Sequence, residues 1–401
     1  MKHMKKTLGV YYHMPFKIED ANLFGNPVMG TFVESLAPHF KKILLFGFES
    51  ISDSNQITYR INDDRIDFVS LGPQGQLWDY IHKIKRVRNI IKKNSNNIDY
   101  FLFRVPSHLA YAIWKYALKP KKVILLFVGN PYFTSDYSNR NVFMYFFRKY
   151  RSFAHDYKMK MLCKNSSAIV LANSDSLVKI WMEKLDYPVS IIQTSSLSKK
   201  YINHARTENY FKNDPYKLLF VGRVCYDKGI RELFRALKEL NNLNDGKYIL
   251  DILGPIGDIG GFTFDKLASN YEVQNYINYQ GVVPFGEEIF KFYKKSDAYI
   301  LPSYHEGMPH AIWEAMSQGT PVISTPVGGI GDAFVDKRDI IFARVKDHKS
   351  IVKSVIKLKG NKILRNSLIK NGYLNSTNVT SEAQTERILE IMDKYWKNFE
   401  E

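Results

Sequence analysis

One short stretch, Pro302–Gly329, constrains the fold of this chain more than any other. An apolar run ends at Leu301, a helix is expected to begin at Met308-Pro309 and to end at Gly319, and an apolar strand follows at Val322–Ser324. Proline fits the first turn of a helix, where its missing N–H costs nothing, and glycine is favoured just past the last turn. The stretch therefore predicts a strand, a loop, a short helix and a second strand.

Two carboxylates lie on this element, Glu306 in the loop and Glu314 further along the helix. The helix N-terminus directs free backbone N–H groups and the positive end of its dipole toward any bound anion, which suits a phosphate. The carboxylates can accept hydrogen bonds from sugar hydroxyls, so the arrangement indicates a site for a nucleotide sugar. For two isolated glutamates, a solvated helix face with a capping side chain would be the simpler interpretation.

The order and spacing of these residues resemble the family 4 glycosyltransferases, which are retaining enzymes of the GT-B fold. The family's mark is a Glu-x7-Glu element followed by alanine, a Gly-x-Pro-Val-Ile strand and a Gly-Gly turn. The chain carries this pattern at Glu306, Gly307, Glu314, Ala315, Gly319, Pro321, Val322, Ile323, Gly328 and Gly329. Gly331-Asp332 then stands where many relatives have Pro-Glu, so the resemblance assigns no role to Asp332.

The first half of the chain alternates apolar strand candidates with amphipathic helices, which predicts a parallel sheet covered on both faces. We expect strands at residues 8–12, 42–46, 67–71, 99–103, 123–128 and 167–171, and helices that include residues 31–36 and 77–91. A Gly-x-Gly-x-x-Gly fingerprint is absent, which argues against a standard dinucleotide site. The Gly-rich loop of many family members is replaced by a longer connection that ends at Phe24–Pro27.

A second series of strands is expected at residues 218–222, 249–254, 277–282, 298–302 and 322–325, after a polar segment, residues 196–216, that reads as an interdomain linker. At 401 residues the chain exceeds the usual size of a single core. We predict an N-terminal acceptor-binding Rossmann-like domain, residues 1–196, completed by a helix at 385–401, and a C-terminal nucleotide-sugar-binding Rossmann-like domain, residues 197–384. By resemblance, these are the two doubly wound parallel-sheet domains of the α/β GT-B fold, which face each other across a cleft.

Two cations follow the first strand of the second series. Gly222-Arg223 ends that strand, and Lys228 precedes the next helix. Ligands of such sheets bind at the carboxyl ends of the strands, where the planar fork of arginine and the mobile charge of lysine suit phosphate oxygens. The spacing also resembles the diphosphate clamp of the family. If Arg223 and Lys228 stood alone, solvated surface charges would be the simpler interpretation. Because the Glu306 element is also present, we interpret them as the diphosphate clamp.

The resemblance implies further donor contacts. Gly254 and Val283 end the next two strands at the same sheet edge and are expected to flank the nucleotide base, although ordinary turn chemistry explains them almost as well. We expect Glu306 to orient the donor sugar and Glu314 to hold the ribose. The predicted donor-binding set is Gly222, Arg223, Lys228, Gly254, Val283, Glu306, Gly307, Met308, Pro309, His310, Ala311 and Glu314.

Catalysis would require little acid–base machinery, because a nucleoside diphosphate is a good leaving group whose developing charge Arg223, Lys228 and the helix start can stabilise. Retention in the family is thought to proceed on one face of the donor, with the leaving phosphate helping to deprotonate the acceptor, so we name no protein nucleophile. His108, beyond the strand at 99–103, resembles a histidine that many members place near the donor sugar, although a surface or core histidine fits equally. The predicted catalytic set is Glu306, Arg223, Lys228 and His108.

We expect no metal ion and no cofactor other than the nucleoside-diphosphate sugar that serves as donor substrate. The chain has no Asp-x-Asp motif, and His305 and His310 lie five positions apart instead of the four of a zinc motif, with Gly307 and Pro309 interrupting the helix. Uridine and guanosine diphosphate sugars are both compatible with the site. A UDP-sugar is favoured by its frequency in the family.

The composition of the chain indicates in which cellular compartment the protein is expected. Only two cysteines, Cys163 and Cys225, argue against a disulfide framework. The basic N-terminal sequence lacks the apolar core of a signal peptide, and no apolar run approaches the roughly 18 residues of a membrane span. We therefore expect a cytoplasmic protein that is soluble or peripheral on the inner face of the cell membrane.

Lys and Arg exceed Asp and Glu by 57 to 40, a net charge of +17 that favours anionic partners. Cations interleave with apolar residues at 83–93, and residues 144–151 mix aromatic rings with Arg and Lys. Such segments suit an anionic membrane surface and a lipid-linked acceptor, while a solvated face over a core stripe is the competing interpretation. No helix-turn-helix, zinc spacing or RNP-like motif supports nucleic-acid binding.

Together with the resemblance, which implies a retaining mechanism, these features predict a metal-independent hexosyltransferase that moves a sugar from a nucleoside-diphosphate sugar to a saccharide acceptor. By resemblance, the acceptor is expected to be lipid-linked and the context to be bacterial surface polysaccharide or lipopolysaccharide assembly. The alternatives are a GT-B phosphorylase, a sugar-nucleotide hydrolase, or a basic nucleic-acid-binding protein without enzyme activity.

Overall fold

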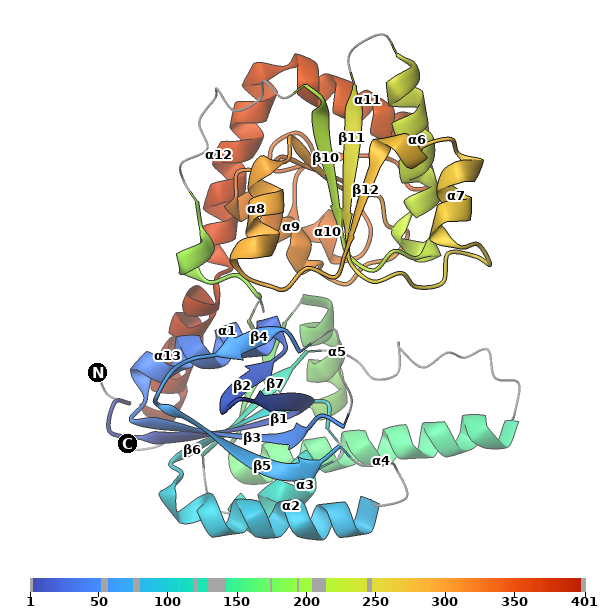
Figure 1. Cartoon of the computed structure of the whole chain (residues 1–401). Coiled ribbons are helices and arrows are strands. Elements are labelled where there is room, and N and C mark those ends of the chain that lie inside the picture. Colours follow the sequence, from blue (N-terminus) through green and yellow to red (C-terminus); the bar gives the residue numbers. More distant parts are fainter. Residues whose placement is uncertain are drawn as a thin grey trace. The chain divides into compact units, whose positions relative to one another are not determined.

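The computed structural model (Figure 1) describes residues 3–51, 57–74, 80–107, 109–118, 122–128, 142–173, 175–192, 195–203, 214–243 and 247–397. It divides into two compact units, one of residues 1–194 with 381–401 and one of residues 195–380. Each unit has its own parallel sheet with helices on its faces. The predicted α/β class with doubly wound parallel sheets is therefore confirmed.

In the first unit, seven parallel strands run in the order β5-β3-β1-β6-β7-β8-β9. The strands alternate along the chain with helices that return across the sheet, as the β/α pattern predicts. Their bounds are β1 Thr7–Glu19, β3 Lys42–Glu49, β5 Ile66–Pro73, β6 Tyr100–Val105, β7 Lys122–Phe127, β8 Ile169–Ala172 and β9 Ser190–Ile191.

The helices of this unit cover both faces of the sheet. On one face, apolar residues of α2, α3, α4 and α5 bury a core with the strands, and on the other α1 packs against α13 (Figure 1). The bounds are α1 Pro27–Leu36, η1 Ala37–His39, α2 Tyr80–Asn94, η3 Ser95–Asn97, α3 Ala110–Ile113, the π-helical turn η4 Trp114–Leu118, α4 Val142–Ser166, α5 Asp175–Leu185 and α13 Ser381–Lys397.

The connection from β1 to α1 is a β-ribbon. β1 continues to Glu19 and turns back through Asp20 and Ala21, whose φ angles are 48° and 61°, into the antiparallel strand β2, Asn22–Gly25. β2 pairs in turn with β4, Tyr59–Ile61. Two successive positive φ angles are the geometry of a tight hairpin turn. The sequence predicted only a longer connection here and no hairpin, because the turn has no Asn-Gly or Asp-Gly signal and Pro15 interrupts the strand pattern.

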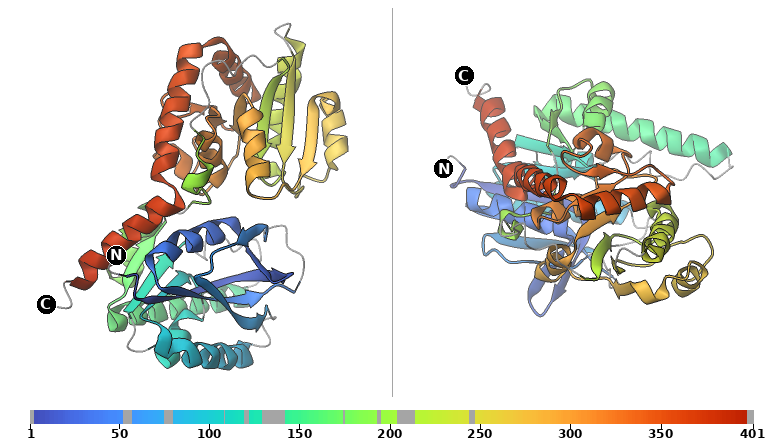
Figure 2. Two further views of the ribbon diagram at one scale, coloured as in Figure 1. Left: turned by 60° about the vertical axis from the view of Figure 1, so that its left-hand side comes forward. Right: turned by 90° about the horizontal axis from the view of Figure 1, so that it is seen from above.

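Helix α13 is part of the first unit, although the second unit precedes it in the chain. Figure 2 shows it lying along the first unit. Ser35 of α1 shares a buried hydrogen bond with Thr385, and the ring of Trp396 stacks on Tyr100 at 5.1 Å between centroids. These contacts make α13 a structural component of this unit.

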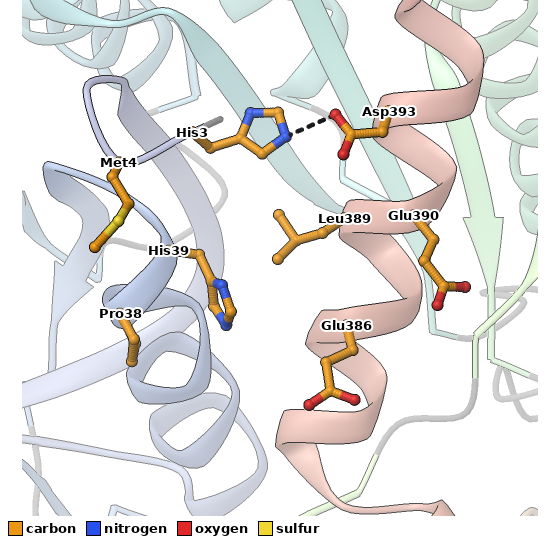
Figure 3. Close-up of a pocket in the computed structure, with 8 residues that line it drawn as sticks. All are labelled: His3, Met4, Pro38, His39, Glu386, Leu389, Glu390 and Asp393. Carbon is orange, nitrogen blue, oxygen red and sulfur yellow. Dashed lines mark ion pairs between the residues drawn. The ribbon is translucent and has the colours of Figure 1, made fainter. Parts of the chain in front are cut away.

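A pocket of about 540 Å³ lies where α13 faces the N-terminal residues and η1. Figure 3 shows His3 paired with Asp393 at 3.2 Å, and His39 opposite Glu386. Burial lowers the pKa of His39, and the nearby Glu386 carboxylate opposes that shift.

The second unit has six parallel strands in the order β12-β11-β10-β13-β14-β15. They are β10 Tyr216–Val221, β11 Tyr248–Leu253, β12 Ile277–Gly281, β13 Ala298–Leu301, β14 Val322–Ser324 and β15 Ile341–Phe342. The helical elements are η5 Lys199–Tyr201, η7 Tyr226–Lys228, α6 Ile230–Asn242, α7 Phe264–Asn270, η8 Gln274–Tyr276, α8 Glu287–Lys295, α9 His310–Ser317, α10 Gly329–Ala333, α11 His348–Gly360 and α12 Lys362–Asn378. Within the segment read as a linker, Ser196 and Leu197 are buried in this unit.

The stacking of Trp396 on Tyr100 leads to a prediction about stability. Because Trp396 is 6% exposed, Trp396→Ala should lower the free energy of unfolding of the first unit by about 3–5 kcal/mol, the usual cost of removing a buried tryptophan. Urea unfolding measures the loss. Lys394→Ala, at an exposed position on the same helix, should change it by less than about 0.5 kcal/mol. Equal stability of the two variants would contradict the assignment of α13 to this unit.

Candidate active site in the second unit

The candidate site lies where the strand order of the second sheet reverses. β10, β11 and β12 extend to one side, and the chain then returns to place β13, β14 and β15 on the other. The reversal between β10 and β13 is the point at which ligands bind in open α/β sheets, outside the carboxyl ends of the strands. Arg223 and Lys228 follow β10, and Glu306 follows β13.

Close backbone contacts join the loops that follow β10 and β13. The N–H of Tyr304 donates to the carbonyl of Asp227 at 2.8 Å. Gly229 has a φ of 70°, and a Cβ added there would lie 2.1 Å from the carbonyl oxygen of Pro302, so only glycine fits. The backbone itself therefore fixes the separation of the Lys228 and Glu306 loops.

Lys228 and Glu306 form an ion pair across this junction. Lys228 Nζ donates to Glu306 Oε1 at 2.7 Å, and the hydroxyl of Ser303 donates to the same oxygen at 2.7 Å. The two charged side chains are 16% and 9% exposed. A lysine ammonium has three donors and a carboxylate has two oxygens. Within the described residues, Glu306 Oε2 has no hydrogen-bond donor. Lys228 can therefore still donate to a ligand, and Glu306 can still accept a hydrogen bond from one.

Helix α9 starts beside this pair. The sequence predicted its first turn at Met308-Pro309; in the structure Pro309 is the extended N-cap, and His310 is the first helical residue. Gly319, with a φ of 66°, follows its end as predicted. In the part of the chain that the structure describes, no side chain caps the N-terminus of α9, nor those of α6 and α10, which follow β10 and β14. The uncapped N–H groups and the helix dipoles favour an anion here.

His310 lies in the first turn of α9, and its environment makes it neutral. Burial lowers the pKa of His310 to about 4. Its Nδ1 atom is buried and has no hydrogen-bond partner among the described residues. An uncharged imidazole can donate or accept one hydrogen bond toward a ligand, but it adds no positive charge to the site.

Arg223 lies on a second pair of joined loops. Beyond β10, Val224 forms a bridge with Ile256, and the N–H of Gly257 donates to the Val224 carbonyl at 2.9 Å. Gly254, after β11, packs on the carbonyl of Gly222, which a Cβ would approach to 2.0 Å. Arg223 is exposed and extends from this surface. Gly222, Arg223 and Gly254 thus lie together, as the sequence predicts for one strand edge.

Glu314 lies on the buried face of α9. Its Oε1 accepts from the Ser196 hydroxyl at 2.7 Å and its Oε2 from the Tyr293 hydroxyl at 2.9 Å. Burial raises the pKa of Glu314, and these two hydrogen bonds oppose the rise. Both carboxylate oxygens are therefore occupied by protein hydroxyls in this structure, which the sequence did not anticipate.

The remaining predicted residues lie at several places. Met308 and Ala311 are half-buried against the core, as is Val283 beyond β12, and Gly307 is exposed beside Gly329, whose N–H donates to its carbonyl at 2.8 Å. His108 falls outside the described residues. Among the residues that the structure describes, no group of three or more His, Cys, Asp and Glu side chains could hold a metal ion.

Burial raises the pKa of the Cys225 thiol to about 11, so it is protonated at neutral pH.

Sequence reasoning missed five residues that position the site: Ser196, Ser303, Tyr293, Tyr304 and Glu232. Tyr304 donates a buried hydrogen bond to Glu232 in the first turn of α6, which ties the Glu306 loop to the helix that follows Lys228. Ser303 lies within the stretch that the sequence singled out, three positions before Glu306, and its spacing could have suggested the contact. The Ser196–Glu314 bond spans 118 positions and leaves no signal in the sequence.

Comparison with known proteins agrees with this geometry. Residues 202–375 match the family model of glycosyl transferases group 1, and this range lies within the second unit and contains Arg223, Lys228, Glu306 and Glu314. The second unit is a group 1 glycosyl transferase domain. The family predicted from the Glu306–Gly329 pattern is thereby confirmed at the level of group 1.

Similarity to other proteins extends beyond this domain. Protein CapJ of Staphylococcus aureus is 23% identical over 349 residues, which cover 86% of this chain and 85% of that protein. The N,N'-diacetylbacillosaminyl-diphospho-undecaprenol alpha-1,3-N-acetylgalactosaminyltransferase of Campylobacter jejuni is 23% identical over 204 residues, 49% of this chain and 51% of that enzyme.

A solved structure shares the fold of the whole chain. HepE of Anabaena, crystallised with UDP and glucose, superposes with a TM-score of 0.65 at 12% identity, over 97% of this chain and 100% of that one. This agreement confirms the predicted GT-B fold.

The buried Glu314 network predicts a pH-dependent stability. Tyr293→Phe should lower the free energy of unfolding by about 1–3 kcal/mol, because a buried carboxylate oxygen loses its donor. Since the phenol stabilises the ionised form, the loss should be greatest where Glu314 is charged and should shrink as the pH falls through its raised pKa. Denaturant titrations across pH measure it.

Tyr226→Phe is the control, because Tyr226 is 45% exposed and its hydroxyl has no hydrogen bond among the described residues. It should leave stability within about 0.5 kcal/mol of wild type at every pH. A Tyr293→Phe penalty that does not vary with pH would show that Glu314 does not change charge over the range tested.

Proposed function

We propose that this protein is a retaining glycosyltransferase that moves a sugar from a nucleoside-diphosphate sugar to a saccharide acceptor. The observation that carries the proposal is the Lys228–Glu306 pair beside the uncapped start of α9, at the reversal point of the second sheet. One member of the pair supplies positive charge for phosphate and the other supplies an acceptor for sugar hydroxyls. A nucleoside-diphosphate sugar presents both groups within one molecule.

The residues have distinct roles in this proposal. Arg223 and Lys228 bind the diphosphate, and the N–H groups at the start of α9 add to the stabilisation of negative charge that develops as the sugar leaves. Lys228 donates to Glu306 with one of its three N–H groups, so two remain for phosphate oxygens. Glu306 uses Oε1 for that pair and offers Oε2 to the donor sugar.

Glu314 is proposed to hold the ribose, and this role requires one of its oxygens to exchange a protein hydroxyl for a ribose hydroxyl. The Ser196 hydroxyl, which donates to Oε1, is the simpler partner to replace, because Ser196 lies outside any helix or strand. His108 is retained as a residue near the donor sugar by resemblance alone. We name no protein nucleophile and no metal, since the leaving phosphate can deprotonate an acceptor bound on the same face of the donor.

The relatives guide the choice of donor and acceptor. HepE was crystallised with UDP and glucose, which supports a UDP-sugar donor. The Campylobacter relative is named for a diphospho-undecaprenol acceptor, which supports a lipid-linked saccharide acceptor and a place in bacterial surface polysaccharide or lipopolysaccharide assembly. A phosphorylase or a sugar-nucleotide hydrolase would use the same donor site. Product analysis separates these reactions, because they release a sugar phosphate or a free sugar instead of a glycoside.

A thermal-shift panel of UDP, GDP, ADP, CMP and their sugar conjugates tests the donor proposal. One nucleoside diphosphate should raise the unfolding temperature, since a ligand at about 100 times its Kd stabilises the native state by about 2.7 kcal/mol. Arg223→Ala should abolish the shift. Arg235→Ala, an exposed arginine on α6, should retain it.

No shift with any nucleotide would remove the support for a transferase. Salt-dependent binding of oligonucleotides in its place would favour the nucleic-acid-binding alternative.

We further propose that helix α4 attaches the protein to an anionic membrane surface at the cytoplasmic leaflet. Phe153 and Tyr157 are 70% and 58% exposed and lie four residues apart, on one face of α4. They continue the aromatic and basic segment 144–151, whose side chains lie outside the described residues. On α2, in contrast, Val87 and Ile91 are buried in the core, and the described side chains that it exposes include Lys85 and Lys92. Within the described residues, every helix is too short or too polar to cross a bilayer.

Sedimentation with liposomes tests this attachment. Wild type should co-sediment with vesicles that contain phosphatidylglycerol at low salt, and the double variant Phe153→Ser, Tyr157→Ser should bind at least about fivefold more weakly because two interfacial rings are lost. Ile363→Ser, at a position 84% exposed in the second unit, is the matched control. Failure of wild type to bind at low salt would contradict the proposal.

A further inference from the structure

The first sheet has its own reversal point, and it lies between β1 and β6. From β1 the chain builds outward through β3 and β5, then returns to place β6, β7, β8 and β9 on the other side of β1 (Figure 1). By the rule that locates the donor site in the second unit, a ligand of the first unit binds outside the carboxyl ends of β1 and β6.

Tyr12 and Arg104 occupy this position. Tyr11 of β1 pairs with Phe103 of β6, and Tyr12 and Arg104 are the next residue on each strand. Tyr11 and Phe103 belong to the buried core on one face of the sheet. Because side chains alternate along a strand, Tyr12 and Arg104 lie on the opposite face. The guanidinium carbon of Arg104 lies 4.6 Å from the centroid of the Tyr12 ring.

Arg104 is a half-buried cation that has no acidic partner among the described residues. Burial lowers its pKa, and among the described residues the one neighbouring group that favours its charge is Tyr12, itself 4% exposed. Within the described part of the chain, its guanidinium forms neither a hydrogen bond nor an ion pair. Other cations in partly buried positions do have carboxylate partners: Lys184 pairs with Asp156 and Lys228 with Glu306.

An unpaired buried charge is unfavourable, and a guanidinium carries five N–H donors in a fixed plane that matches the oxygens of a phosphate or carboxylate. The Tyr12 ring packs against one side of the guanidinium plane, and the N–H groups at the edge of that plane can donate hydrogen bonds to another group. The arrangement provides for an anion that this chain does not supply from its described residues.

We propose that Arg104, held on the Tyr12 ring, binds an anionic group of the acceptor, with a phosphate adjoining the acceptor sugar as its ligand. This inference rests on the proposed glycosyltransferase function and names a substrate class for it: acceptors whose sugar is next to a phosphate, as in a lipid-linked diphosphate saccharide. A uronic acid would present the same chemistry through its carboxylate. The proposal makes Arg104 an acceptor-binding residue, distinct from the donor clamp of Arg223 and Lys228.

Calorimetric titration of the full chain with inorganic pyrophosphate tests the proposal. The titrations use the Arg223→Ala background, so that the proposed donor clamp does not obscure a second site, and glucuronate and glucose serve as carboxylate and neutral probes. Pyrophosphate should bind, and adding Arg104→Met should weaken its binding at least about tenfold, because charge-assisted hydrogen bonds are lost. Arg104→Lys, which keeps the charge but not the planar fork, should fall between the two. Arg60→Met, at an exposed position in the same unit, should have no effect.

Thermal unfolding without ligand separates a binding role from a structural one. Arg104→Met should unfold at the same temperature as its parent or higher, because it removes an uncompensated buried charge. A lower unfolding temperature with unchanged pyrophosphate affinity would overturn the proposal and assign Arg104 to packing on Tyr12. Binding of glucuronate but not pyrophosphate through Arg104 would overturn the phosphate assignment in favour of a uronic acid.

The outcome is separable from that of the nucleotide panel. Arg104-dependent pyrophosphate binding without any nucleotide effect would keep the anion site and reject the transferase. A nucleotide effect that depends on Arg223, together with pyrophosphate binding indifferent to Arg104, would keep the transferase and reject this inference.

Discussion

Both units depend on one geometric constraint: parallel strands can follow each other only if the chain returns across a face of the sheet between them. All carboxyl ends of a sheet then share one edge, and the loops that follow them gather there. In the second unit this constraint brings Lys228 and Glu306, 78 positions apart in the sequence, into a 2.7 Å ion pair. The short backbone contacts around Gly229 and Tyr304 are possible only because β10 and β13 are already neighbours.

Among the described residues, the ionisable groups of the proposed donor and acceptor sites are balanced in three different ways. Lys228 and Glu306 balance each other, Glu314 relies on two hydroxyls without a cation, and Arg104 relies on an aromatic ring. A hydroxyl can rotate away from Glu314, and an aromatic ring cannot neutralise the full charge of Arg104. Glu314 and Arg104 therefore leave more of their charge for a ligand to neutralise than the Lys228–Glu306 pair does. These two residues, Glu314 for the ribose and Arg104 for the acceptor anion, are the ones in the proposed sites whose charge the protein itself neutralises least.

The sequence was sufficient to predict the sheets and the residues at their edges, but not how those residues pair. β/α alternation located the main strands of both units, and the Glu306–Gly329 pattern located α9 and its neighbours. The sequence could not show that Glu314 accepts hydrogen bonds from Ser196 and Tyr293, because those contacts depend on tertiary packing. The β1–β2 ribbon was missed because its turn residues, Asp20 and Ala21, are not typical of a tight hairpin. Arg104 follows the strand predicted at 99–103, but only the structure shows that it has no counter-charge among the described residues.

The position of α13 also bears on how the chain can be made. A ribosome releases residues 195–380 before α13, yet Trp396, Thr385 and Tyr395 complete contacts of the first unit with Tyr100, Ser35 and Tyr187. During synthesis, the second unit therefore has all of its residues available while the first still lacks a helix. The unit that is translated first is therefore the one whose folding can be completed last.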